Sequence, residues 1–125
     1  EDHVFVAGSE PQILYYSQRF SATRFVAVYP LMIPSPMAQR YQWDAIHDLQ
    51  EHPPTIIVLV QLDASWLKQA NSPSDFLNYL MGTLQVEYEL LGGYVIGEQS
   101  GQWTEPLSLS DSDHASLLLF KRRQL

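Results

Sequence analysis

Hydrophobic residues in this chain form five short runs, separated by segments in which apolar side chains recur at helical spacing. The runs cover residues 4–7, 25–29, 55–62, 86–97 and 115–120, and each is rich in β-branched, aromatic or leucine residues. Runs of this length and composition predict β-strands. The run at 55–62 is apolar without a break from Ile56 to Val60, which is typical of a central strand covered on both faces.

The first strand is followed by a corner, Gly8-Ser9-Glu10-Pro11, and then by a short helical pattern. Ser9 is expected to cap this helix, and Pro11 suits its first turn, where a backbone N–H is not needed. The helical spacing directs three side chains at the sheet, namely Ile13, Leu14 and Tyr16.

Two longer helices are predicted further along the chain. One is capped by Ser35, begins at Pro36 and ends before Pro53; its apolar stripe is Ala38, Tyr41, Ala45, Ile46 and Leu49. The other begins at a capping-box-like Ser72-Pro73-Ser74-Asp75, and its apolar positions are Phe76, Leu77, Leu80 and Leu84. Residues 63–70 predict a short connection with one helical turn.

The alternation of strands and helices predicts an α/β fold. We expect a mainly parallel, Rossmann-like sheet of about five strands with flanking helices, in which the last strands are free to pair antiparallel. Gly92-Gly93 inside the fourth run predicts a bulge, a turn or a close backbone approach, and the polar stretch 99–114 predicts a surface loop. A chain of 125 residues fits a single domain, residues 1–125.

Composition narrows the function classes. The net charge of −7 makes nucleic acid an unlikely partner, because an acidic surface repels phosphate backbones. The absence of cysteine excludes thiol catalysis, disulfides and thiolate metal sites. No segment is long and apolar enough to span a bilayer. The basic cluster Lys121-Arg122-Arg123 either contacts anionic lipid headgroups or, as clusters of this size do more often, keeps a chain end in solution.

Familiar catalytic and metal motifs fit the chain poorly. The corner at Gly8 has one glycine where phosphate-binding loops have several, and Gly-Ser-Glu-Pro is not the Gly-x-Ser-x-Gly of a serine nucleophile elbow. A metal site could be sought among His47, Asp48, Glu51 and His52, but their order differs from His-Glu-x-x-His and a solvated helix face explains them better. We therefore expect no metal, no cofactor and no catalytic residue.

Several segments together resemble a family. They are Gly8-Ser9-Glu10-Pro11, Tyr15, Arg19, Arg24-Phe25, Tyr29-Pro30-Leu31, His52-Pro53-Pro54 with the strand after it, Tyr88, Leu90, Tyr94 and the basic-ended run 117–123. This pattern resembles the C-terminal soluble domain of bacterial polytopic membrane glycosyltransferases of the GT-C type. Those enzymes are the relatives of the dolichyl-phosphate-mannose protein mannosyltransferases and the aminoarabinose transferases.

The resemblance implies a place and a partner. The chain would be the C-terminal part of a longer membrane protein, tethered by transmembrane helices at the extracytoplasmic (periplasmic) face of the inner membrane. The parent enzyme would transfer sugar from a polyprenyl-phosphate carrier, with its catalytic acids in the membrane portion. This domain would be non-catalytic, would contact the membrane portion of the same polypeptide, and would cover the active site or contact the lipid-linked sugar or acceptor.

Ligands of open α/β sheets bind at the carboxyl ends of the strands, which places a candidate ligand site at the first corner. Its predicted residues are Gly8, Ser9, Glu10, Gln12, Tyr15 and Arg19. Arg19 could hold a phosphate or carboxylate and Tyr15 could stack on a ring; alternatively, Arg19 pairs with Glu10 or another acid and only pins the helix. A different function also stays open, that of a stand-alone α/β binding module or small enzyme with a nucleotide or sugar ligand.

Overall fold

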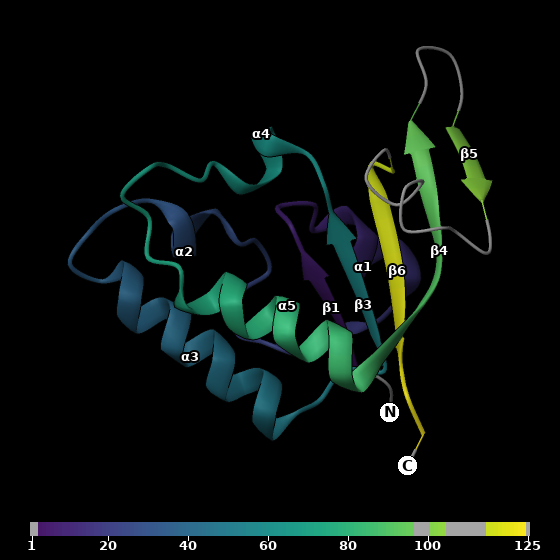
Figure 1. The fold of residues 1–125 in the computed structure, drawn as a ribbon, viewed down its shortest axis with the longest axis horizontal. Coiled ribbons are helices and arrows are strands. Elements are labelled where there is room, and N and C mark those ends of the chain that lie inside the picture. The colour runs from purple at the N-terminus through teal and green to yellow at the C-terminus, as the bar shows by residue number, and fades with distance from the viewer. Residues whose placement is uncertain (1–2, 97–100, 105–114, 125) are drawn as a thin grey trace.

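The computed structural model describes residues 3–96, 101–104 and 115–124, and these form one mixed sheet with helices on both faces (Figure 1). The sheet order is β2-β1-β3-β6-β4-β5. The strands are β1 (His3–Ala7), β2 (Phe20–Ser21), β3 (Ile56–Val60), β4 (Tyr88–Ile96), β5 (Gly101–Thr104) and β6 (Leu117–Arg122). The α/β class is thus confirmed, and β3 has the central place that its apolar run predicted.

The direction of pairing changes across the sheet. β1 pairs in parallel with both β2 and β3, whereas the β3–β6, β6–β4 and β4–β5 pairings are antiparallel. Three of these five pairings are therefore antiparallel, which is a larger share than the sequence predicted. The reason is that the last strand, β6, lies between β3 and β4 and runs opposite to both, whereas β3 and β4, which are connected through α5, run in the same direction.

In the described part of the chain, five helices flank the sheet. They are α1 (Gln12–Ser17), α2 (Tyr29–Met32), α3 (Ala38–Glu51), α4 (Asp63–Trp66) and α5 (Asp75–Glu87). The main core lies between one sheet face and helices α2, α3 and α5, while α1 packs on the opposite face through Leu14 (Figure 1). None of the helices in the described part of the chain combines the length and the apolar character that a membrane crossing requires.

The predicted strand at 25–29 is wrong. The place beside β1 is taken by Phe20 and Ser21, and residues 22–28 form bends before α2 begins at Tyr29. The hydroxyl of Thr23 donates to the carbonyl of Phe25 at 2.9 Å and accepts the Phe25 N–H at 3.1 Å. These side-chain bonds give the backbone local partners in place of a strand ladder, and the fixed φ of Pro30 then favours the start of a helix.

One ion pair attaches this bent segment to α3. Both oxygens of Asp48 accept hydrogen bonds of 2.9 Å from the Arg24 guanidinium, and one of them also accepts the Arg24 backbone N–H. These bonds hold the pKa of Asp48 below its ordinary value. Asp48 was predicted to face water, but it is half-buried against this partner.

The N-terminal ends of the helices differ from their predicted caps. Ser9 does not cap α1, which starts after Pro11 without a side-chain cap. α5 starts after Ser74, also without one; its first turn is instead bonded by Gln42 of α3, whose side-chain oxygen accepts the Phe76 N–H at 2.9 Å. Ser72 is used elsewhere, because its hydroxyl donates to the Met32 carbonyl. Tertiary contacts have therefore replaced the local capping that the sequence indicated.

The C-terminal half of the sheet confirms one prediction and corrects another. The β4–β6 register shifts between Leu90 and Gly92, so the Gly92-Gly93 pair marks a bulge. Residues 101–104, expected within a surface loop, form β5 and pair with β4. The rest of the predicted loop at 99–114, apart from these four residues, lies outside the described residues.

Candidate functional site

The corner after β1 is built on a close approach between two strands. A Cβ atom added to Gly8 would lie 2.5 Å from the Cγ2 atom of Val60 and 2.5 Å from Oε2 of Glu10. The Gly8 carbonyl accepts the N–H of Val28 at 3.2 Å, which attaches the segment before α2 to the same point. Gly8 therefore brings the β1 corner against the end of β3, and its small size rather than an unusual φ is what the fold uses.

Ser65 of α4 joins this corner to the segment after β3. Its hydroxyl donates to Oε2 of Glu10 at 2.6 Å and accepts the backbone N–H of Ser9 at 2.7 Å. The Ser9 hydroxyl in turn accepts the Tyr29 N–H at 3.3 Å. Gly8, Ser9 and Glu10 thus lie together at the end of β1. Their polar groups are already hydrogen-bonded to Val28, Tyr29 and Ser65.

The other three predicted ligand residues lie on or after α1. Gln12, Tyr15 and Arg19 are exposed, and α1 carries them back from the corner towards the start of β2. Tyr15 is 78% exposed and its ring packs edge-on against Tyr16, which is 80% exposed. Tyr16 was expected to pack on the sheet, and this is wrong, because α1 ends at Ser17 and turns only Leu14 fully inward.

The alternative role proposed for Arg19 also differs from what the structure contains. Glu10 accepts the Ser65 hydroxyl, and no ion pair forms between Glu10 and Arg19, both of which lie in the described part of the chain. Arg19 therefore does not pin the helix by that contact. Its guanidinium is available to a ligand or a surface.

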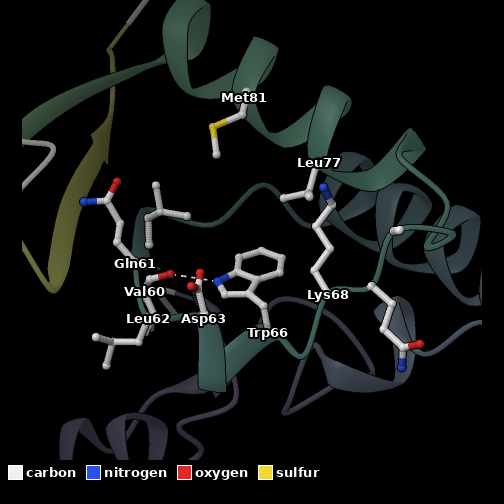
Figure 2. A pocket seen from close by; sticks show the side chains of 11 residues that line it. Val60, Gln61, Leu62, Asp63, Trp66, Lys68, Leu77 and Met81 are labelled. Carbon is white, nitrogen blue, oxygen red and sulfur yellow. Dashed lines mark hydrogen bonds between the residues drawn. The ribbon is translucent and has the colours of Figure 1, made fainter.

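A cavity of about 660 Å³ opens beside the corner, at the carboxyl end of β3 (Figure 2). Val60, which contacts Gly8 from one side, belongs to its wall. The cavity lies between the segment that follows β3 and one side of α5. The lining residues are Leu59, Val60, Gln61, Leu62, Asp63, Trp66, Lys68, Gln69, Ala70, Leu77 and Met81.

Trp66 is a largely buried residue of the cavity wall, and its ring is held in a fixed orientation (Figure 2). Its indole N–H donates to the Val60 carbonyl at 2.7 Å, and its ring packs against Phe76 at a centroid distance of 6.5 Å. Leu77 and Met81 of α5 lie across from the ring. The cavity thus has an apolar wall with one rigid aromatic ring, a surface on which the C–H face of a ligand can pack.

The rim of the cavity is polar and carries both signs of charge. Asp63 and Lys68 are exposed at the mouth, and the side chain of neither forms an ion pair or a hydrogen bond with another described residue. Gln69, the residue after Lys68, also lines the cavity and adds an amide group. Carboxylate, ammonium and amide groups around an apolar wall can orient a small polar molecule through directed hydrogen bonds.

The histidines and acids of α3 do not converge. His47 lies 3.9 Å from Glu51 on an exposed helix face, Asp48 is held by Arg24, and His52 stacks on His3 at 5.9 Å. Within residues 3–96, 101–104 and 115–124, no three His, Asp or Glu side chains are grouped closely enough to hold a metal ion.

The sequence placed the candidate site at the corner after β1, whereas the cavity lies beside that corner, at the carboxyl end of β3. Trp66 packs against Phe76 and also lines the cavity. The sequence did not identify Leu77 and Met81 as site residues, because their spacing is that of ordinary positions in an amphipathic helix. The one available signal was the strong strand at 55–62 followed at once by Asp63, Trp66 and Lys68, which places polar and aromatic groups at a strand's carboxyl end.

Comparison with known proteins adds no relative to this picture. No protein-family model, curated protein or solved structure matches the chain.

Proposed function

We propose that this chain is a non-catalytic, extracytoplasmic domain of a membrane glycosyltransferase that takes sugar from a polyprenyl-phosphate carrier, and that the domain binds carbohydrate of the donor or acceptor. The observation that carries the proposal is the cavity at the carboxyl end of β3. It combines the fixed Trp66 ring with the free Asp63 and Lys68 side chains at its mouth.

A sugar fits these groups in chemical terms. One face of a pyranose ring presents C–H groups, which pack on an indole, and its edge presents hydroxyls that hydrogen-bond to carboxylate and amide oxygens. Lys68 can neutralise a phosphate or other anionic substituent. The volume of about 660 Å³ lies within the range typical of small-molecule sites.

The proposal assigns different roles to the six residues predicted from the sequence. Gly8, Ser9 and Glu10 hold the corner against α4, so they position the wall of the cavity. The Glu10 carboxylate does this by accepting the Ser65 hydroxyl. Gln12, Tyr15 and Arg19 form a separate exposed surface on α1. A ligand contact by these three remains part of the proposal and is tested separately below.

Location and partner follow the same proposal. The domain would lie at the periplasmic face of the inner membrane, connected to the membrane portion of its own polypeptide. The parallel order β2-β1-β3, with α1 and α3 on opposite faces, supports a Rossmann-like origin for this half of the sheet. Such sheets carry their ligands at the strand ends where the cavity lies.

The binding proposal is tested by titrating the 125-residue chain with methyl α-mannoside and with a short-chain polyprenyl-phosphate mannose, followed by calorimetry. Asp63→Asn and Lys68→Gln should each weaken binding of at least one probe about tenfold, since each removes a charge-assisted hydrogen bond. Arg40→Gln, an exposed residue of α3 outside the cavity, is the matched control and should bind like the parent chain.

The same titration separates the cavity from the α1 surface. Loss of binding in Arg19→Ala, with Asp63→Asn and Lys68→Gln unaffected, would move the site to α1. Absence of binding by every variant and by the parent chain, across a wider set of glycosides, would remove the support for a carbohydrate site.

The membrane attachment is tested in the gene. The reading frame before Glu1 should encode several apolar segments of about 20 residues, the length of a transmembrane helix. A complete reading frame that starts next to Glu1 would contradict the membrane part of the proposal. In that case the cavity would favour the alternative of a stand-alone α/β module with a sugar or nucleotide ligand.

A further inference from the structure

The end of the sheet opposite the cavity places distant segments in one row. His3 pairs with Phe20, the carbonyl of His3 accepts the Thr55 N–H, the carbonyl of Thr55 accepts the Arg122 N–H, and Arg122 pairs with Tyr88. This row crosses the sheet from β2 to β4 at the amino ends of the parallel strands. The first described residues of the chain and its last strand therefore meet at one end (Figure 1).

Basic side chains gather at this end. Arg19 stands directly before Phe20, and Lys121 and Arg123 flank Arg122, so four of the seven basic residues of the chain lie here. All four are exposed, and none forms an ion pair with another described residue. Thr55 and residues 121–124 line a hollow of about 500 Å³ between them.

The acidic groups of the same end do not neutralise this cluster by direct contact. Glu87 is the last residue of α5, Glu89 lies at the start of β4, and Glu51 lies at the end of α3 near His47. Glu89 is opposite Lys121 in the strand register, yet no ion pair joins them. Among the remaining basic residues, by contrast, Arg24 is bonded to Asp48 and lies near Asp44.

Two exposed aromatic side chains accompany the basic residues. Phe20, in the row itself, is 65% exposed, and Tyr16, four residues earlier near the end of α1, is 80% exposed. Basic residues beside exposed aromatic ones match the chemistry of a lipid interface, with anionic headgroups next to apolar chains.

We propose that this end of the domain binds the surface of an anionic phospholipid membrane, with the four basic side chains on headgroup phosphates and Phe20 in the interface. The four basic residues outnumber the acids named at this end, which are Glu51, Glu87 and Glu89. Acids at the cavity end, such as Glu10 and Asp63, are separated from the cluster by β3, whose five residues span roughly 17 Å at about 3.3 Å per residue. That distance exceeds the Debye length of about 8 Å at physiological ionic strength, so these acids add little to the field at the cluster. The inference rests on this cluster alone and holds whether or not the cavity binds a sugar.

The test is co-sedimentation of the 125-residue chain with two kinds of vesicle. One kind is pure phosphatidylcholine, and the other contains about one third phosphatidylglycerol, an anionic lipid. The chain should bind the anionic vesicles only, and about 0.5 M salt should release it, because that concentration screens the headgroup charge. Lys121→Gln with Arg123→Gln should weaken binding about thirtyfold, since each of the two basic residues near an anionic surface contributes about 1 kcal/mol.

Two matched variants make the result specific. Arg40→Glu lowers the charge by the same two units on an exposed position of α3 and should bind like the parent chain. Lys121→Arg with Arg123→Lys keeps the charge and should also bind. Three outcomes overturn the proposal: no binding by the parent chain, equal loss in the Gln pair and in Arg40→Glu, or equally tight binding to a soluble polyanion such as heparin, which would indicate a general anion surface.

Discussion

Gly8 shows how one small residue sets the geometry of the candidate site. The Val60 side chain occupies the space that a Cβ atom at position 8 would need, and Val60 is itself a wall of the cavity. A side chain at position 8 must push β1 and β3 apart or displace Glu10. The residue is therefore required by packing, at a position where the sequence suggested a turn.

Gly8→Ala should lower the free energy of unfolding by about 1–3 kcal/mol, the usual cost of overpacking a buried position. Gly82→Ala is the matched control. Gly82 lies exposed inside α5 with nothing within 4 Å of the added Cβ, so the change should stabilise the chain by about 0.5–1 kcal/mol through helix propensity. Urea unfolding of both variants measures the two changes in the free energy of unfolding. Equal changes for Gly8→Ala and Gly82→Ala would contradict the close approach at Gly8.

Tyr88 is the second residue whose surroundings give it a measurable property. Its side chain is buried, and its hydroxyl donates to the Pro54 carbonyl at 2.6 Å. Burial raises the pKa of this phenol to about 12. A raised pKa means that the folded state holds the proton more tightly than the unfolded state, so its contribution to stability is complete below about pH 10 and is lost as the pH rises towards 12.

Tyr88→Phe should lower the free energy of unfolding by about 1–2 kcal/mol at pH 8, because the buried Pro54 carbonyl loses its donor. The difference between the parent chain and the variant should then narrow as the pH rises from 10 to 12. Urea unfolding at pH 8 and pH 11 measures both effects. A difference that stays constant over this range would show that Tyr88 titrates normally.

At the scale of elements, the sequence predicted best where a single pattern decides the structure. The apolar stripe of α3 and the unbroken apolar run of β3 must be buried whichever elements pack against them. Both elements were found as expected. The run at 25–29 has equal strand character, but the hydroxyl of Thr23 bonds to Phe25 and Pro30 starts a helix. Competition between local and sheet hydrogen bonds is not visible in a hydrophobic pattern.

Gln42 connects three helical segments, and the hydrophobic pattern gave no sign of this. It is fully buried in α3; its amide donates to the carbonyls of Leu31 and Pro73, each at 2.8 Å, and its oxygen accepts the Phe76 N–H. The nitrogen and the oxygen of its side-chain amide are therefore both hydrogen-bonded. The position of α5, which carries one wall of the cavity, therefore depends on a side chain of α3.

Gln42→Leu should lower the free energy of unfolding by about 2–4 kcal/mol, since it leaves two carbonyls and one N–H buried without this partner. Gln50→Leu, an exposed position of the same helix, should change it by less than about 0.5 kcal/mol. Thermal unfolding compares the two. Similar midpoints for both variants would mean that Gln42 does not hold α5 in place.

The candidate site was predictable only in part, and for a related reason. Gly8, Ser9 and Glu10 are neighbours in the chain, so a rule about strand ends was enough to group them. The cavity joins Trp66 and Lys68 to Met81 of α5, and this grouping depends on how α5 packs over the sheet. No spacing in the sequence records that packing.

At the scale of the whole molecule, the two proposed surfaces lie at opposite ends of the same strands. The basic cluster at Arg122 lies at the amino end of β3, and the cavity at Trp66 lies at its carboxyl end. A carrier lipid keeps its sugar close to the membrane, whereas the cavity would stand roughly 17 Å, the length of β3 at about 3.3 Å per residue, further out. This separation favours an acceptor carbohydrate as the ligand, and a polyprenyl chain should add no affinity.

The most direct test of the carbohydrate site is the NMR signal of the Trp66 indole N–H during titration with a panel of methyl glycosides. Trp66 lines the cavity, whereas the Trp43 indole donates to Asp75 outside it and serves as an internal control. The account predicts that at least one glycoside shifts the Trp66 signal in a saturable manner, leaves the Trp43 signal in place, and loses its effect in Lys68→Gln or Asp63→Asn. A Trp66 signal that no glycoside moves, or that moves only together with Trp43, would contradict it.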